Sequence, residues 1–331
     1  MEVKQKNEIG ITLKGVGSYL PEQVLSNNDL SRIVDTSDDW IKTRTGISNR
    51  RISKSEEDVS YMGYEAALNA LEMANWNPES IDLIILATST PNDLFGSAPL
   101  IQSKLGAKNA FAFDLTAACS GFIFALITAS QYLKAGNCKR ALIIGSDQLS
   151  SYVDWNDRGS CILFGDGAGA IAIESNLNKN NLYGFTMRTD GDRGSFLNLG
   201  CENKSDKIND NLVFKKGNFA KITMNGQEVY KFAVREVPII IENLLKETNY
   251  SADEIDWLLL HQANQRILDA VGERLKISKS KVLSNLSNYG NTSAATIPIM
   301  LDESIRNKKI KENDLIVSSG FGAGLSWGAA L

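Results

Sequence analysis

The feature that most constrains the fold is an order of elements that occurs twice, about 170 residues apart. Residues 61–88 run through an amphipathic helix, an acidic turn, the pair Ile-Asp and a strongly apolar strand, and residues 230–262 repeat this order. Two further pairs follow at nearly the same offset: 105–116 with 275–286, and 139–147 with 311–320. The identity is weak, so a chance similarity is the alternative. Otherwise the chain consists of two similar α/β halves packed face to face.

Five apolar runs are continuous rather than alternating, which is typical of strands buried on both faces. They are residues 81–88, 110–116, 140–146, 255–261 and 314–320. Helical patterns lie between them, and residues 229–245 carry an apolar stripe with the spacing of one helix face. Pro238 within this stripe predicts a kink or the start of a new segment. The chain is therefore expected to be an α/β protein.

Composition and charge exclude several classes of function. The chain has 331 residues and a net charge of −4, so bulk charge gives no reason to expect nucleic acid or a membrane surface as partner. The N-terminus, MEVKQKNEIG, is charged, and no apolar run approaches the ~18 residues of a membrane span. Four scattered cysteines read as reduced cytosolic thiols. A single histidine, His261, excludes histidine-rich metal sites.

Cys119 lies in the stretch DLTAACSGFIFAL, where a strand is followed by a helix. Residues 111–116 have a strand-like pattern and residues 120–136 a helical one. A helix N-terminus favours the thiolate, which is the reactive form of cysteine. Cys119 is thus a candidate nucleophile, and the alternative is a small buried apolar residue.

Two other polar residues are expected at the same edge of the sheets. His261 ends the strand 255–261, and ligands of open α/β sheets collect beyond the carboxyl ends of strands. Asn291 in the stretch SNYGNTSAAT is expected to follow a strand and precede a helix. The alternatives are a buried, hydrogen-bonded histidine and an ordinary turn asparagine.

Other motifs fit less well. The glycine-rich turns at 164–170 and 318–328 offer backbone N–H groups but do not match a phosphate-binding loop. The order Cys, His, Asn also occurs in papain-like proteases. The flanking protease motif is absent here, and buried parallel strands do not suit that fold.

Four motifs together closely resemble the β-ketoacyl-acyl-carrier-protein synthase III family. They are TAACSGF, LLLHQANQRI, YGNTSAAT and VDTSDDWIKTRTGISNRRI, and the resemblance extends from about Gly15 to Ala330. It implies a thiolase-like fold with two pseudo-symmetric halves, whose mixed sheets pack in α-β-α-β-α layers. The expected halves are residues 1–180, with the nucleophilic cysteine, and 181–331, with histidine and asparagine. Residues 198–219 are expected to be a surface loop or hairpin insertion without a chemical role.

The resemblance implies a decarboxylative condensation of acetyl-CoA with malonyl-acyl carrier protein. The products would be acetoacetyl-acyl carrier protein, CO2 and CoA. Cys119 would carry the acetyl group as a thioester, and His261 and Asn291 would donate hydrogen bonds to the malonyl thioester oxygen. The backbone N–H groups of Cys119 and Ala323 would hold the acetyl oxyanion. No metal or other cofactor is expected.

The resemblance also implies binding surfaces for both substrates. The CoA site would comprise Trp40, Arg44, Arg158, Gly226 and Asn264, with Trp40 and Arg158 stacking on either side of the adenine. The docking surface for the acidic carrier protein would comprise Gln262, Ala263, Asn264, Gln265, Arg266, Lys231 and Arg274. The alternative for these charged residues is an ordinary solvated surface.

The sequence departs from the family pattern at Ala323, where members often have a third consecutive glycine. Leu94 and Phe95 occupy a region that in relatives crosses a dimer interface. The resemblance implies a homodimer, and the reduced thiols favour a cytoplasmic location. Two alternatives remain: a relative that acts in secondary metabolism, and a non-catalytic partner subunit. The intact Cys119 argues against the second alternative, and Asn291 with the basic surface favours fatty-acid synthesis over the first.

Overall fold

The computed structural model describes residues 9–331, so most of the charged N-terminal stretch lies outside the described residues. The order of the first sheet is β1 (Gly10–Tyr19), β7 (Asp166–Asn176), β6 (Arg140–Gln148), β4 (Leu83–Ala87) and β5 (Phe111–Leu115). The sheet is mixed: β4 runs parallel to both of its neighbours, β5 and β6, whereas β7 is antiparallel to β6 and to β1.

The second sheet repeats this plan with one strand fewer. Its order is β13 (Trp257–Leu260), β14 (Ile316–Gly322), β15 (Ser326–Ala330) and β8 (Phe185–Thr189). In it, β13 and β14 are parallel, and β15 is antiparallel to both of its neighbours, β14 and β8. The five predicted strands are therefore confirmed as β4, β5, β6, β13 and β14. Only β5 departs from burial on both faces, because it is an edge strand on which Phe111 is exposed.

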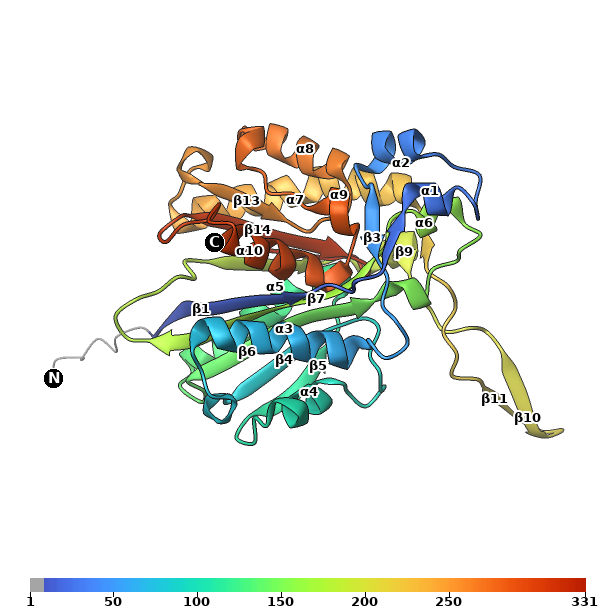
Figure 1. The fold of residues 1–331 in the computed structure, drawn as a ribbon, viewed down its shortest axis with the longest axis horizontal. Helices are drawn as coiled ribbons and strands as arrows, with labels where there is room; N and C mark the ends of the chain where they lie inside the picture. The colour runs from blue at the N-terminus through green and yellow to red at the C-terminus, as the bar shows by residue number, and fades with distance from the viewer. Residues whose placement is uncertain (1–8) are drawn as a thin grey trace.

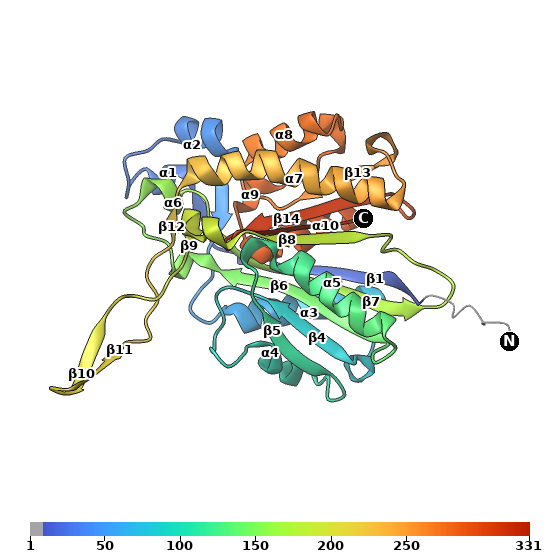
Figure 2. The ribbon, with the colours of Figure 1, turned by 180° about the vertical axis from the view of Figure 1, so that it is seen from behind.

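Helices and sheets alternate in five layers, as the resemblance predicts (Figure 1, Figure 2). Apolar cores fill the spaces between successive layers, since the continuous apolar strands present side chains to both faces. The outer helices of the first sheet are α3 (Val59–Ala74) and α4 (Ala98–Leu105), the central ones α5 (Gly121–Lys134) and α10 (Thr296–Arg306), and those over the second sheet α7 (Gly226–Thr248) and α8 (Gln265–Arg274).

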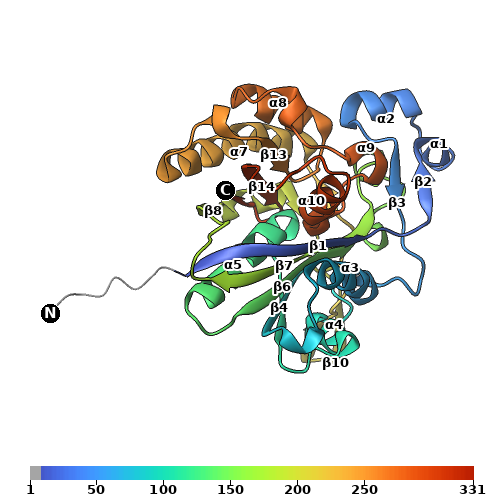
Figure 3. The ribbon, with the colours of Figure 1, turned by 60° about the vertical axis from the view of Figure 1, so that its left-hand side comes forward.

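A cap of short elements covers one end of the layers (Figure 3). Its own apolar cluster joins segments that are far apart in the sequence. The elements are β2 (Val24–Ser26), α1 (Asn27–Leu30), α2 (Asp38–Thr45), β3 (Asn49–Arg51), α6 (Arg158–Cys161), β9 (Leu197–Asn198), β12 (Thr223–Met224) and α9 (Leu286–Tyr289). The cap matters for function because it carries residues expected at the CoA site.

The predicted insertion is a hairpin that projects from the body (Figure 1). Its strands are β10 (Ser205–Asn209) and β11 (Leu212–Lys215), which pair in antiparallel register. The expectation of a surface hairpin at residues 198–219 is therefore confirmed.

Two segments differ from the patterns in the sequence. Residues 275–286, which the repeat pairs with the segment that contains β5, contribute only an isolated bridge from Val282 to Leu258. α7 continues through Pro238 to Thr248, so no new segment starts at the proline. Because proline has no N–H, the Val234 carbonyl loses its helical partner, and the Arg274 guanidinium donates to it at 3.3 Å.

No helix within residues 9–331 has the length and apolar character needed to cross a membrane.

The two halves meet so closely at β6 that only glycine fits at position 145. A Cβ on Gly145 would collide with the backbone carbonyl of Ala294, which belongs to the second half. We expect Gly145→Ala to destabilise the fold by about 1–3 kcal/mol, because backbone atoms cannot move aside as a side chain can. Thermal unfolding measures this loss as a lower Tm. Gly217→Ala is the matched control, since nothing lies within 4 Å of its added Cβ. Equal Tm values for the two variants would contradict the predicted packing.

Candidate active site

Cys119 lies between a strand end and a helix start, as predicted. β5 ends at Leu115, a 3-10 helix spans Ala118–Ser120, and α5 begins at Gly121. Ala118 has a φ of 47°, a left-handed conformation that costs energy and is often found at active sites. On the other side, a Cβ at Gly322 of β14 would lie 2.7 Å from the Cys119 nitrogen, so only glycine permits this contact. Cys119 is thus held between the two halves.

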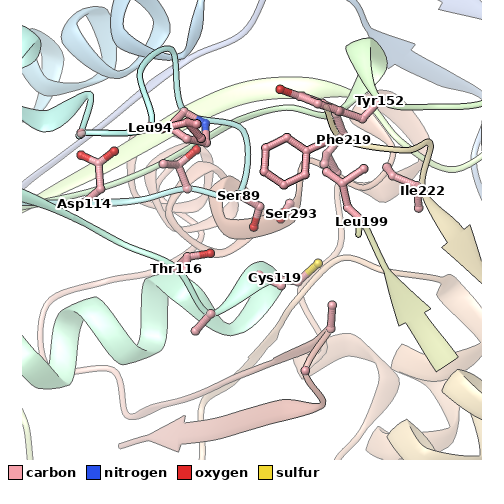
Figure 4. Close-up of a pocket in the computed structure, with 18 of the residues that line it drawn as sticks. Ser89, Leu94, Asp114, Thr116, Cys119, Tyr152, Leu199, Phe219, Ile222 and Ser293 are labelled. Atoms are coloured by element: carbon pink, nitrogen blue, oxygen red, sulfur yellow. The ribbon is translucent and has the colours of Figure 1, made fainter. Parts of the chain in front are cut away.

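Two cavities meet at Cys119. The larger has a volume of about 790 Å³ and is mainly apolar, and Figure 4 shows Cys119 and Ser293 on its wall with Leu94 and Phe219. The smaller, of about 100 Å³, is lined by Cys119, His261 and Asn291. The residues predicted to be catalytic therefore share one small cavity, although they come from separate parts of the chain.

His261 follows β13 and is only 1% exposed. Its Nδ1 lies 2.7 Å from the Thr296 hydroxyl, and its ring meets the edge of Phe321 at 5.2 Å between centroids. Burial lowers the pKa of His261 to about 3, so the imidazole is neutral at physiological pH. A neutral imidazole can donate or accept a hydrogen bond without introducing a charge.

Asn291 is held by backbone and side-chain hydrogen bonds. Its N–H donates to the Leu163 carbonyl, and its own carbonyl accepts from Gly165 N–H, within the glycine-rich stretch 164–170. Its side-chain oxygen accepts from Ser293 N–H at 2.8 Å, which leaves the amide NH2 to donate elsewhere. The expected strand before Asn291 is absent, because the short helix α9 precedes it.

The thiol of Cys119 is neutral in the free protein. Burial raises its pKa to about 12, and the nearby Asp147 carboxylate adds to this effect, while a hydrogen bond from Ser293 opposes it. The helix N-terminus acts in the opposite direction and favours the thiolate. A thiol in this state has to lose its proton when it acts as a nucleophile.

Ala323 lies in the turn between β14 and β15 and lines the larger cavity beside Cys119. Its methyl group does not prevent the close approach, because the contact with the Cys119 backbone is made by Gly322. The position of Ala323 suits the expected oxyanion role.

The residues expected to bind CoA fall into two places. Gly226 and Asn264 line the small cavity with the catalytic residues. Trp40, Arg44 and Arg158 form a stack in the cap, with guanidinium carbons 4.5 Å and 4.8 Å from the Trp40 ring centre. A base between Trp40 and Arg158 would need about 3.5 Å on each side. The expected sandwich is therefore closed in this structure, and Arg158 has to move for adenine to enter.

The residues expected to form the carrier-protein surface differ in their exposure. Lys231, Arg266 and Arg274 are exposed on α7 and α8. Gln262 is 1% exposed, and its amide donates to the Leu260 carbonyl at 2.7 Å, so it supports the fold and is not available to a partner. The three other residues of this stretch, Ala263, Asn264 and Gln265, are half-buried.

Sequence reasoning missed several residues of the site. The insertion, to which no chemistry was assigned, supplies part of the wall of the large cavity through Leu199 and Phe219 (Figure 4). Apolar residues within an otherwise polar segment were the only signal. Ser293, Thr296 and Asp147 were also missed, although the first two lie in the YGNTSAAT motif and Asp147 is the penultimate residue of a buried strand.

Comparisons with known proteins agree with this geometry. The family model of 3-oxoacyl-[acyl-carrier-protein] synthase III matches residues 113–191. A second family model, of the C-terminal part of that synthase, matches residues 245–331. A curated β-ketoacyl-[acyl-carrier-protein] synthase III of Prochlorococcus marinus (strain MIT 9515) is 72% identical over 331 residues, covering 100% of this chain and 99% of that protein. This chain belongs to the β-ketoacyl-[acyl-carrier-protein] synthase III family.

Solved structures show that this synthase III has the thiolase-like fold of its relatives. The 3-oxoacyl-[acyl-carrier-protein] synthase III of Aquifex aeolicus VF5 is 45% identical, with a TM-score of 0.89 over 97% of this chain and 99% of that one. The priming β-ketosynthase of the R1128 polyketide pathway is 30% identical, with a TM-score of 0.90 over 100% and 98% of the two chains.

The raised pKa of Cys119 predicts how its alkylation depends on pH. Because the thiolate is the reactive form, the rate with iodoacetamide should rise from about pH 6 to pH 10 without levelling off. Peptide mass spectrometry follows Cys119 separately from the exposed Cys201, which shows that the reagent remains active. A rate that levels off below about pH 8 would mean that Cys119 is a thiolate at neutral pH.

Proposed function

We propose that this synthase III starts fatty-acid synthesis by condensing a short acyl-CoA, acetyl-CoA in the first place, with malonyl-acyl carrier protein. The observation that carries the proposal is the small cavity, where Cys119 meets a buried neutral His261 and the amide of Asn291. The Cys119 thiol can hold an acyl chain, and His261 and Asn291 can donate hydrogen bonds to a developing oxyanion.

The first half-reaction transfers the acetyl group. Cys119 Sγ attacks the acetyl carbonyl as its proton leaves, the carbon–sulfur bond to CoA breaks, and the proton ends on the CoA thiol. The backbone N–H groups of Cys119 and Ala323 would hold the carbonyl oxygen as it becomes negative. The acetyl methyl would lie in the large apolar cavity.

The second half-reaction forms the new carbon–carbon bond. The bond to the malonyl carboxylate breaks and releases CO2, and its electron pair forms an enolate at the thioester oxygen. His261 and Asn291 donate hydrogen bonds to that oxygen, and a neutral histidine does so without trapping the enolate as an ion pair. The enolate carbon attacks the acetyl carbonyl carbon, the bond to Cys119 Sγ breaks, and the released thiolate takes a proton from water to restore the thiol. No step requires a metal or a redox cofactor.

The acyl-bearing ends of CoA and of the carrier protein would enter through the small cavity. Asn264 and Gly226 line it between the catalytic residues and the surface, and the stack on Trp40 lies in the adjoining cap. The exposed cations of α7 and α8 offer a docking surface for an acidic carrier protein. A nucleophilic free thiol suits a reducing compartment, so we place the enzyme in the cytoplasm.

Intact-protein mass spectrometry tests the two half-reactions separately. After incubation with acetyl-CoA, the mass should increase by one acetyl group, and malonyl-acyl carrier protein should then remove it. Cys119→Ser should show no acetylated mass. A panel of longer acyl-CoAs in the same assay shows whether the large cavity selects another primer. Discharge that fails with malonyl-acyl carrier protein would contradict the proposed function.

The variants His261→Ala and Asn291→Ala test which half-reaction each residue serves. Both variants should still form acetyl-enzyme, because their hydrogen bonds act on the malonyl oxygen. Condensation should fall by about 10²–10³-fold, the loss typical of one oxyanion donor. Equal losses in the two half-reactions would show that these residues also serve acylation.

We further propose that the active enzyme is a homodimer built on the edge strand β5. The side chains around it are apolar and exposed, with Phe95 100% and Leu94 74% accessible. Leu94 and Phe95 also lie at the mouth of the large cavity, so a second copy here would contact the site of its partner. Sedimentation should give twice the mass of 36.2 kDa, and Phe111→Lys should shift it toward the monomer. A monomeric wild-type protein with full activity would contradict the proposal.

A further inference from the structure

The turn between Asn291 and α10 touches both hydrogen-bond donors of the site. It comprises the 3-10 helix Ser293–Ala295 and the first residue of α10, Thr296, and all four residues are buried. Ser293 has a φ of 52°, so its backbone is held in a conformation that a serine rarely adopts. A strained turn of this kind persists only where its surroundings fix it.

Asp147 is the group that fixes this turn. It is the penultimate residue of β6, is 0% exposed, and takes no part in the proposed reaction. Its Oδ2 accepts the N–H of Ala294 at 3.2 Å. Its Oδ1 accepts Ser89 N–H at 2.7 Å and the hydroxyl groups of Thr88 and Thr90 at 3.1 and 3.0 Å. One carboxylate thus ties the turn of the second half to the end of β4 in the first.

The fixed turn reaches both donors. Ser293 N–H binds the side-chain oxygen of Asn291, which aims the amide NH2 away from the turn. The Thr296 hydroxyl lies 2.7 Å from His261 Nδ1 and 3.0 Å from the Ser293 carbonyl. Its single proton can serve only one of these acceptors at a time.

Two arrangements of this proton fit the contacts: the hydroxyl donates to His261 Nδ1, or it donates to the Ser293 carbonyl and accepts a hydrogen bond from Nδ1–H. The role proposed for His261 requires the first arrangement, because the ring has to donate from Nε2. When the hydroxyl donates to Nδ1, the ring proton must be on Nε2. Only this tautomer can donate from Nε2 into the small cavity, and since the ring is neutral, the tautomer decides what His261 does.

We infer that Thr296 is a positioning residue whose hydroxyl keeps the proton of His261 on Nε2. Asp147 holds the turn that fixes the positions of Thr296 and Asn291. Thr296 acts through His261 and does not contact the substrate. The inference rests on the proposed function, which requires donation from Nε2, but the tautomer itself can be measured in the free protein.

The single histidine makes a direct test possible. In protein labelled with ¹⁵N-histidine and freed of any affinity tag, every imidazole signal in a long-range ¹H–¹⁵N spectrum belongs to His261. We expect a protonated Nε2 and an unprotonated Nδ1, unchanged from about pH 8 to pH 5 because burial keeps the ring neutral. A proton on Nδ1 in the free protein would overturn the inference.

Two matched variants test the consequence for catalysis. Thr296→Val keeps the shape but removes the hydroxyl, and Thr296→Ser keeps the hydroxyl. In Thr296→Val we expect a mixture of tautomers and a condensation step slower by about 10- to 100-fold, with acetylation of Cys119 close to that of the wild type. Thr296→Ser should restore condensation.

The outcomes separate this inference from the proposed function. If wild-type protein is not discharged by malonyl-acyl carrier protein, the proposed function fails, whatever the tautomer is. If wild type condenses but Thr296→Val does so equally fast, or loses both half-reactions together, Thr296 does not act through His261. Should Thr296→Val fail to fold, the wild-type tautomer and Thr296→Ser still decide the inference.

Discussion

The close contact between the two halves is the constraint on which the site depends. The N-terminal ends of α5 and α10 meet at the centre of the molecule, where Gly145 and Gly322 let backbones approach more closely than any other residue would allow. Cys119 comes from one half, and His261 and Asn291 from the other. Because the halves are built on similar sheets, the carboxyl ends of their strands converge on one place, and polar side chains there become neighbours.

Burial sets the chemistry of this place. It raises the pKa of Cys119 and lowers that of His261, so both groups are neutral before a substrate enters. Such a site stabilises charge only where charge develops, through hydrogen bonds whose donors are already in position. The buried Asp147 and the turn at Ser293 hold those donors, and the packing around the turn balances the strain in the Ser293 backbone.

The sequence predicted the layered fold and the three candidate catalytic residues that share the small cavity, because each lies where a strong local pattern ends. Cys119 follows an apolar strand and His261 ends another, so the topology alone brings them together. Contacts that depend on side-chain burial were not predictable. Gln262 looked like part of a surface motif, yet its amide supports the Leu260 carbonyl. The hydroxyl of Thr296 carries no signal in a sequence, since its role exists only through the ring of His261.

A crystal structure of the acetylated enzyme with a stable malonyl-thioester analogue would show whether His261 and Asn291 together bind the malonyl thioester oxygen beside Cys119. We expect this oxygen within hydrogen-bonding distance of His261 Nε2 and of the Asn291 amide nitrogen, with the acetyl group extending into the large cavity. A malonyl group bound instead against Leu94 and Phe219, without contact to either donor, would contradict this expectation.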